Sequence, residues 1–314
     1  MRKLALPAAA LAAITLALGA CTSASQDAGS GDTAGGSASP SAQGFDTSSI
    51  AEDADIAAMV PEAVATDGAL TIGSNLEYAP NEFVAADGRT PVGFDIDIIN
   101  AVARTMGLEP QIENAGFDSI IPAIGSKYEV GISSFTINPE RLEQVNMVSY
   151  FTAGSALAVQ QGNPDGIPAD DVAGEALCGV TVGVQTGTIQ QEQLETVSQE
   201  CEAAGNEAID LLPYDSQADV TTNLAGGKLQ AMYADSPIVA YAVEQTNGQV
   251  EQLGGIDDAA PYGVVVAKAD TELAEAVQAA LQKLMDDGTF AEILDAWGQG
   301  EGGLDTAEVN PNVG

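Results

Sequence analysis

Residues 93–107 read GFDIDIINAVARTMG, and this stretch sets the pattern for the rest of the chain. Its apolar residues Ile98, Val102 and Met106 recur at the spacing that gathers side chains on one face of a helix. The closing glycine stands where a helix is expected to stop. A short apolar strand, ALTIGS at 69–74, precedes the helix, and the six residues after the glycine have the pattern of a second strand. The order strand, helix, strand is the unit from which α/β folds are built.

The same alternation continues to residue 297. Further strands are predicted at 130–133, 155–160, 180–184, 209–212, 229–234 and 262–267, and further helices at 117–126, 138–144, 188–201, 218–225, 236–245, 271–286 and 289–297. We therefore predict an α/β fold with largely parallel sheets in two lobes. Residues 299–314 are rich in glycine and are predicted to fray.

The composition excludes several classes of function. The chain has 314 residues, with 9 Lys and Arg, 46 Asp and Glu, no His, and a formal net charge of −37. Binding of nucleic acid or of anionic lipid by charge requires basic patches, which such a chain does not supply. Without histidine there is no His-dependent catalytic triad and no His-ligated metal site. We expect no metal, no cofactor and no nucleic-acid partner.

The first residues have the pattern of an export signal. Residues 1–20 combine a basic start with an apolar stretch that is too short for a comfortable membrane span. The sequence LGAC at 18–21 looks like a bacterial lipobox, which implies cleavage before Cys21 and acylation of its thiol. Acyl chains there would anchor the chain at the outer face of the bacterial cell membrane. Residues 21–48 then form a lipidated cysteine and a flexible tether. The alternative is a secreted protein in which this cysteine is accidental.

Two cysteines remain after the predicted cleavage, Cys178 and Cys201. An even pair in an exported chain indicates a disulfide, because the thiols lie outside the reducing cytosol. The alternative is two free buried thiols.

Six motifs follow one another between residues 69 and 297. They are YAP (78–80), GFDIDI (93–98), GFDSIIP (116–122), ISSFTINPER (132–141), VGVQTGT (182–188) and ADSP (234–237). In this order and spacing the chain resembles the extracellular solute-binding proteins of family 3, which are the polar amino-acid-binding proteins of ABC importers. The resemblance implies a periplasmic-binding-protein-like type II fold, in which the ligand lies between two lobes joined by a two-strand hinge. It places lobe 1 at 49–154 plus 262–298, lobe 2 at 155–261 and a tail at 299–314.

The two charged ends of an amino acid have matching candidates. Arg141 is the expected partner of the carboxylate, because a guanidinium offers a planar two-point contact, and the resemblance gives it the same role. Asp235 is the expected partner of the ammonium group. The alternatives are a surface arginine on a helix and, for Asp235, an N-cap of the following helix.

Four further residues match positions that enclose the ligand in the family. Tyr78 and Phe117 match the pair that sandwiches the aliphatic part of the ligand, and the alternative is plain core aromatics. Ser134 and Thr136 alternate on an extended stretch, where their side chains or amides are expected to contact the ends of the ligand. For these two the alternative is a turn or capping hydroxyl.

Thr188, Ile189 and Gln190 lie where a strand of the second lobe meets a helix. Exposed amides at a helix N-terminus attract a carboxylate, so we expect all three residues at the site. The family usually has threonine where Ile189 stands, so a hydroxyl contact is missing here.

Asn75 and Glu77 flank Tyr78 and are candidates for contact with the side chain of the ligand. The family position of Asn75 often carries an aspartate in proteins that bind cationic amino acids, and Glu77 is able to supply that charge instead. An acidic ligand would require a second buried cation. The sequence therefore favours a neutral polar or cationic amino acid over glutamate or aspartate.

The predicted function is that of a monomeric binding lipoprotein that delivers an amino acid to an ABC permease and its ATPase. The chain is not expected to be an enzyme. One alternative is a ligand-binding sensor that reports to another membrane protein. A second is a cyclohexadienyl dehydratase-like enzyme on the same fold, for which Glu77 is the candidate general acid.

Overall fold

The computed structural model describes residues 44–313. Cys21 and the predicted signal and lipid anchor therefore lie outside the described residues. In chain order the elements are η1 (Thr47–Ser49), α1 (Ala54–Ala57), α2 (Glu62–Ala65), β1 (Ala69–Ser74), β2 (Glu77–Tyr78), β3 (Glu82–Val84), β4 (Pro91–Val92), α3 (Phe94–Thr105), β5 (Glu109–Asn114), α4 (Phe117–Ala123), β6 (Val130–Gly131), α5 (Pro139–Gln144), β7 (Val145–Gln160), η2 (Glu175–Leu177), β8 (Thr181–Gln185), α6 (Ile189–Ala204), β9 (Asp210–Tyr214), α7 (Gln217–Ala225), β10 (Ala231–Asp235), α8 (Ser236–Gln245), β11 (Val250–Ala267), α9 (Thr271–Asp286), α10 (Thr289–Ala296) and η3 (Gly300–Gly302).

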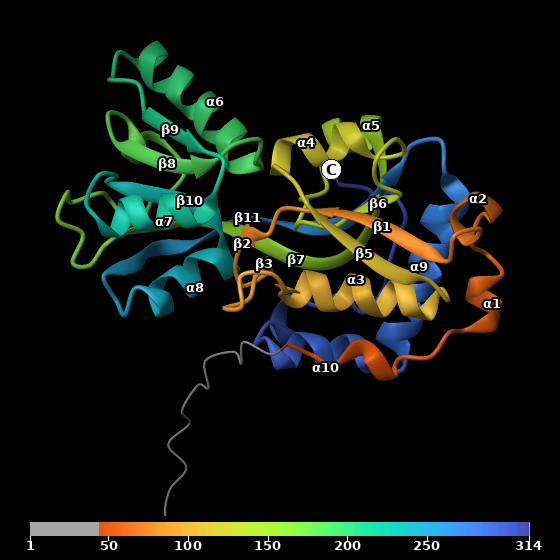
Figure 1. Ribbon diagram of the computed structural model, residues 1–314. Helices are drawn as coiled ribbons and strands as arrows, with labels where there is room; N and C mark the ends of the chain where they lie inside the picture. The colour runs from red at the N-terminus through yellow and green to blue at the C-terminus, as the bar shows by residue number, and fades with distance from the viewer. Residues whose placement is uncertain (1–43, 314) are drawn as a thin grey trace, which may run out of the picture. The chain divides into compact units, whose positions relative to one another are not determined.

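An eight-stranded sheet in the order β5-β1-β6-β11-β7-β10-β8-β9 forms the centre of the fold (Figure 1). The strands β1, β5 and β6 pair in parallel at one end, and β8, β9 and β10 pair in parallel at the other. The long strands β7 and β11 pair antiparallel between them. We call the group of β1 to β6 with α3, α4, α5, α9 and α10 lobe 1, and the group of β8 to β10 with α6, α7 and α8 lobe 2. The α/β prediction is confirmed, and the lobe boundaries stay a prediction.

The two strands that join the lobes are longer than the sequence indicated. Strands were expected at 155–160 and 262–267, whereas β7 has 16 residues and β11 has 18. Their pairing is interrupted by register shifts, for example between Asp257 and Ala260. Because β7 is buried along almost its whole length, its sequence lacks the alternation of polar and apolar residues that marks a strand with one exposed face.

A three-stranded sheet of β2, β3 and β4 was not predicted, because its strands have only two or three residues each. It packs on the start of α3 at Gly93. This glycine has φ +132°, and a Cβ there would lie 2.1 Å from the carbonyl oxygen of Asn81. The first residue of the GFDIDI motif is therefore glycine because the β2–β3 turn approaches the start of α3 closely.

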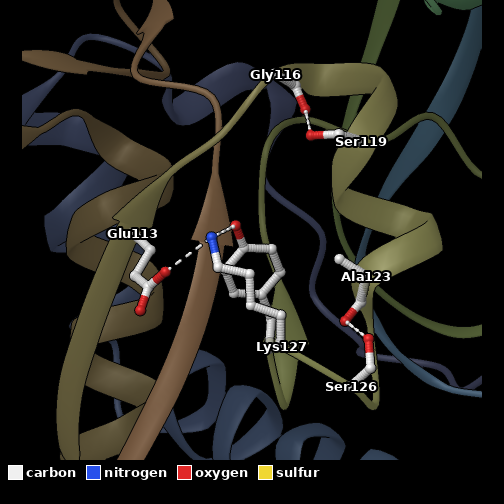
Figure 2. Close-up of polar contacts among 7 residues, drawn as sticks. Glu113, Gly116, Ser119, Ala123, Ser126 and Lys127 are labelled. Carbon is white, nitrogen blue, oxygen red and sulfur yellow. Dashed lines mark hydrogen bonds and ion pairs between the residues drawn. The ribbon is translucent and has the colours of Figure 1, made fainter.

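Helix α4 begins with Phe117, and local hydrogen bonds hold both of its ends (Figure 2). The hydroxyl of Ser119 donates to the carbonyl of Gly116 at 2.6 Å, and the hydroxyl of Ser126 donates to the carbonyl of Ala123 at 3.0 Å. Beyond the helix, the ammonium group of Lys127 lies 3.1 Å from the Glu113 carboxylate of β5. These contacts lie at the two ends of α4 and just beyond it.

The disulfide prediction is confirmed. Cys178 and Cys201 are bonded, with their Cα atoms 5.7 Å apart. Cys201 lies on α6 and belongs to a buried cluster of lobe 2 that also contains Leu177, Val182 and Leu194. The bridge therefore joins α6 to the residues just before β8.

The prediction that the residues after 299 fray is wrong for those that the structure describes. The amide of Leu304 donates to the carbonyl of Tyr150 at 3.1 Å, and the amide of Ser149 donates to the carbonyl of Glu308 at 3.0 Å. The 303–313 segment thus follows β7, and Ala307 is buried. Across residues 44–313, no helix combines the length and apolar character that a membrane crossing requires.

Candidate functional site

Arg141 is a buried cation at the start of lobe 1's short helix α5. The side chain of Asn138 caps this helix and accepts from the Arg141 amide at 2.8 Å, which sets the direction of the arginine side chain. The guanidinium donates to the carbonyl of Thr136 at 2.8 Å and to the carbonyl of Gly187 at 3.2 Å. Only 7% of the residue is exposed.

No carboxylate neutralises this guanidinium. Among the described residues, every ion pair within 4 Å is made by a cation other than Arg141. The guanidinium carbon instead lies 5.6 Å from the ring centre of Phe117 and 5.7 Å from that of Phe135. Burial lowers the pKa of Arg141, because desolvation disfavours its charge. The arrangement leaves a desolvated positive charge without an anion.

Asp235 is the matching buried anion, at the end of β10 in lobe 2. Its carboxylate accepts from the Tyr78 hydroxyl at 2.7 Å and from the side-chain amide of Gln190 at 2.9 Å. It makes no capping hydrogen bond to α8, so its oxygens face the site rather than the helix. Burial raises the pKa of Asp235, and the hydrogen bonds it accepts oppose that rise. The residue is 5% exposed, and no cation lies within 4 Å of it in the described part of the chain.

Three hydrogen bonds join the lobes across this site. Tyr78 of lobe 1 reaches Asp235, Arg141 of lobe 1 reaches Gly187, and the amide of Gln185 of lobe 2 donates to Asn75 at 2.9 Å. Gly187 has φ +77°, and a Cβ on it would lie 2.9 Å from that of Asp118 in lobe 1. Glycine is needed there because the backbone is left-handed and the opposite lobe is close. The structure is therefore in a closed form.

A cavity of about 290 Å³ lies between the lobes beside Asp235, and Arg141 is not among the residues that line it. Thr136, Ile189 and Asp235 line it, as do Ser155 and Val313. The first three were predicted from the sequence as ligand contacts, and the last two were not. Ser155 is a small residue at the start of a predicted strand, and Val313 lies in the segment that was predicted to fray.

Ser134 is held by hydrogen bonds to buried polar side chains, which were not predicted from the sequence. Its backbone is left-handed, with φ 51°, and its amide donates to Asp95 at 2.7 Å. Its hydroxyl donates to Asp95 at 3.1 Å and accepts from the Asn81 side chain at 2.7 Å. Glu82 accepts from the neighbouring Ser133 hydroxyl at 2.6 Å. The amide and the hydroxyl of Ser134 are thus engaged by buried polar side chains, and its predicted contact with the ligand stays a prediction.

Glu82 and Asp95 are two fully buried carboxyl groups that share a hydrogen bond. Burial raises the pKa of Glu82 well above its ordinary value, and it raises the pKa of Asp95 to about 6. The folded state therefore holds a proton that the unfolded chain releases near pH 4 to 5. The only signal in the sequence for the role of Asn81 and Glu82 is that two adjacent polar residues follow the YAP motif.

From this pair we expect the free energy of unfolding to fall as the pH rises above about 5, because the folded state then loses the proton that it binds more tightly than the unfolded chain. Glu82→Gln removes the ionisable partner and is expected to flatten this fall. Urea unfolding at pH 5 to 9 measures the slope, with Glu77→Gln as the exposed control. Equal slopes for the native chain and Glu82→Gln would contradict the shared proton.

Thr188, Ile189 and Gln190 form the start of α6. Thr188 is the N-cap: its hydroxyl accepts from the amide of Gln191 at 3.3 Å and donates to the carbonyl of Gln185 at 2.7 Å. Gln190 donates to Asp235 and to Ser155. The first amides of a helix have no partner within the helix, so those of Ile189 and Gln190 are available to an anion.

Asn75 and Glu77 have different surroundings, although both precede Tyr78 closely in the chain. Asn75 is buried, donates to the carbonyl of Ala115 at 2.9 Å and accepts from Gln185. Glu77 is exposed and lines a second cavity of about 810 Å³ between β2, β3, α7 and α8, rather than the cavity beside Asp235. The described residues contain no cluster of three or more His, Cys, Asp or Glu that is arranged to hold a metal ion.

Comparison with known proteins places these features in context. Residues 70–300 match the family model described as bacterial extracellular solute-binding proteins, family 3. The arginine-binding protein ArgT of Corynebacterium glutamicum is 37% identical over 258 residues, which cover 82% of this chain and 83% of that protein. The L-cystine-binding protein TcyJ of Escherichia coli is 27% identical over 73% of this chain and 82% of that protein.

Two solved structures of amino acid-binding proteins are also similar to this chain. An ancestral arginine-binding protein bound to arginine is 32% identical, with a TM-score of 0.66 over 73% of this chain and 98% of that one. An ancestral amino acid-binding protein that is a precursor of cyclohexadienyl dehydratase is 27% identical, with a TM-score of 0.66 over 75% of this chain and 98% of that one.

Proposed function

The chain belongs to family 3 of the bacterial extracellular solute-binding proteins, and from this premise we propose that it is the substrate-binding protein of an ABC importer, which captures a polar amino acid between its two lobes. One observation carries the proposal. Arg141 and Asp235 are buried opposite charges, and neither has an ion-pair partner among the described residues. Unpaired buried charges are costly, so this closed form is suited to a ligand that brings one charge of each sign.

An α-amino acid is such a ligand. Its carboxylate pairs with the guanidinium of Arg141 and with the first amides of α6. Its ammonium group pairs with Asp235, and the hydrogen bonds that Tyr78 and Gln190 donate to that carboxylate keep it oriented. Phe117 and Tyr78 cover the aliphatic part. Because these groups come from both lobes, the ligand stabilises the closed form over the open one.

We propose arginine as the first ligand to test. The C. glutamicum relative and the ancestral structure are named for binding arginine. The buried side-chain oxygen of Asn75 is an acceptor that suits a donor-rich cationic side chain, whereas Glu77 lines the other cavity. No described Lys or Arg lines the cavity beside Asp235, so an anionic side chain would find no cation there. The sequence likewise favours a neutral polar or cationic amino acid as the ligand.

Members of this family are extracellular binding proteins. The finer proposal is that lipid on Cys21 anchors the chain as a monomer at the outer face of the cell membrane, where the closed form docks on a permease driven by an ATPase. We also propose that the chain binds without catalysis. Glu77, the candidate general acid, is exposed and does not line the cavity beside Asp235, so it lacks the reach that acid catalysis requires.

A thermal-shift screen of the full chain in detergent against the twenty amino acids tests the function. A ligand that binds only the folded state raises the melting temperature once its concentration exceeds Kd. We expect the largest shift for arginine, a smaller one for lysine and none for glutamate. A largest shift for glutamate would overturn the proposed side-chain preference. No shift for any amino acid would overturn the function itself.

A further inference from the structure

The 303–313 segment lies beyond residue 300, where the family match ends, yet it is bound firmly to lobe 1. It follows β7, with isolated bridges between Gly303 and Phe151 and between Val309 and Val148. The side chain of Gln282 on α9 also accepts from the amide of Ala307 at 3.0 Å. The segment is therefore fixed to both a strand and a helix of the same lobe.

Asn310 makes the last hydrogen bonds between this segment and β7, and the chain changes direction there. Its amide donates to the carbonyl of Met147 at 2.7 Å, and its side-chain oxygen accepts from the Met147 amide at 2.9 Å. Its side-chain amide donates to Asn146 at 3.1 Å. Asn310 has φ 52°, a left-handed conformation that asparagine tolerates better than most residues. Pro311 follows and restricts the backbone further, so residues 311–313 leave β7 in a defined direction.

Residues 311–313 lead to the cavity beside Asp235. Val313 lines the cavity together with Thr136, Ile189 and Asp235. It also packs against the buried lobe 1 cluster that contains Phe135 and Ile137, and the end of the chain lies near α4 and α5 (Figure 1). One apolar side chain from a segment outside the family match therefore shares a cavity wall with residues of the zwitterion site.

We propose that the 303–313 segment is a built-in part of the ligand site, in which Val313 forms a lip on lobe 1 that slows the escape of the bound amino acid. The proposal rests on the proposed function. Ile189 and Gln193 of lobe 2 form the facing wall of the cavity. Val313 and that wall enclose one cavity in this closed form, so a lip at Val313 would favour the closed, ligand-bound form.

The test is to end the chain after Asn310. This removes residues 311–314 and leaves every hydrogen bond that Asn310 makes to β7. Removing the Val313 side chain loses the contact of about one buried methyl group, which predicts a roughly fourfold faster release of arginine and a roughly fourfold higher Kd. The association rate should change little. Stopped-flow fluorescence and calorimetry on the full chain and the shortened chain in detergent measure these changes. Asn312→Ala, an exposed neighbour, is the matched control and is expected to bind like the native chain.

The outcomes separate this inference from the function on which it rests. If the native chain binds arginine and the shortened chain releases it at the native rate, the lip is wrong and the function stands. If the native chain binds no amino acid, the proposed function is wrong, and the lip falls with it. If the shortened chain has a lower melting temperature without ligand, Val313→Ala decides: a release rate raised about twofold supports the lip, and an unchanged rate overturns it.

Discussion

Replacing Arg141 with alanine is expected to weaken the binding of arginine about a thousandfold, which corresponds to roughly 4 kcal/mol. The reason is that the ligand carboxylate would then be buried without a cation. No Lys or Arg is among the described residues that line the cavity beside Asp235, so none is placed to replace the lost charge. Arg141→Lys keeps the charge but loses the planar two-point contact, so it should recover only part of the affinity.

Titration calorimetry with arginine and with agmatine, which lacks the carboxylate, isolates this contact. The native chain should bind agmatine far more weakly than arginine, whereas Arg141→Ala should bind both about equally weakly. Arg104→Ala, on an arginine that pairs with Glu109 at the surface, is the matched control and should bind like the native chain. Tight arginine binding by Arg141→Ala would remove that residue from the site.

The same substitution is expected to leave the unliganded fold intact. Arg141 donates to two backbone carbonyls but gains no ion pair, and its desolvation is unfavourable in the absence of ligand. Replacing Arg141 therefore removes an unfavourable desolvation free energy as well as two hydrogen bonds. A melting temperature close to that of the native chain, measured without ligand, would show that lost affinity reflects a lost contact and not unfolding.

Much of this architecture was predictable because local patterns and global contacts agree. Helical spacing marked α3, and proline at the first turn marked α5 and α8, so their bounds fall within a few residues of the prediction. Arg141 and Asp235 are 94 positions apart in the sequence. Their meeting across the lobes was predictable only through the resemblance to a family, since spacing alone does not bring two distant charges together.

The features that were missed depend on tertiary contacts. Glu82 and Asp95 are polar residues with no local sign of burial, and their pairing is defined only once β3 packs on α3. The 303–313 segment has the glycine and polar residues of a loose tail, yet β7 gives its backbone partners that composition does not reveal. The full lengths of β7 and β11 were missed for the same reason, because the two strands chiefly stabilise each other.

Asp235→Ala is the second substitution with a large expected effect, a loss of several hundredfold in arginine affinity, or roughly 3–4 kcal/mol. The ammonium group of the ligand would be buried without an anion, and Tyr78 and Gln190 would lose the acceptor that they share. Nα-acetylarginine, which lacks the ammonium charge, should bind weakly to the native chain and no more weakly to the variant. Asp210→Asn, on the exposed end of β9, is the control. Unchanged affinity in Asp235→Ala would exclude the aspartate as the ammonium partner.

Lowering the pH provides an independent test of the role of the Asp235 carboxylate. Asp235 holds the ammonium group only while it is ionised, and burial raises its pKa, so protonation begins at a higher pH than for an exposed aspartate. Arginine affinity should therefore be constant near neutral pH and fall about tenfold per pH unit once the pH drops below this pKa. In Asp235→Asn the affinity is already low, and its fall with acid should be absent over the same range. A parallel fall in both proteins would show that another group controls release, and the carboxylate at the end of β10 would then not be the site of proton-linked unbinding.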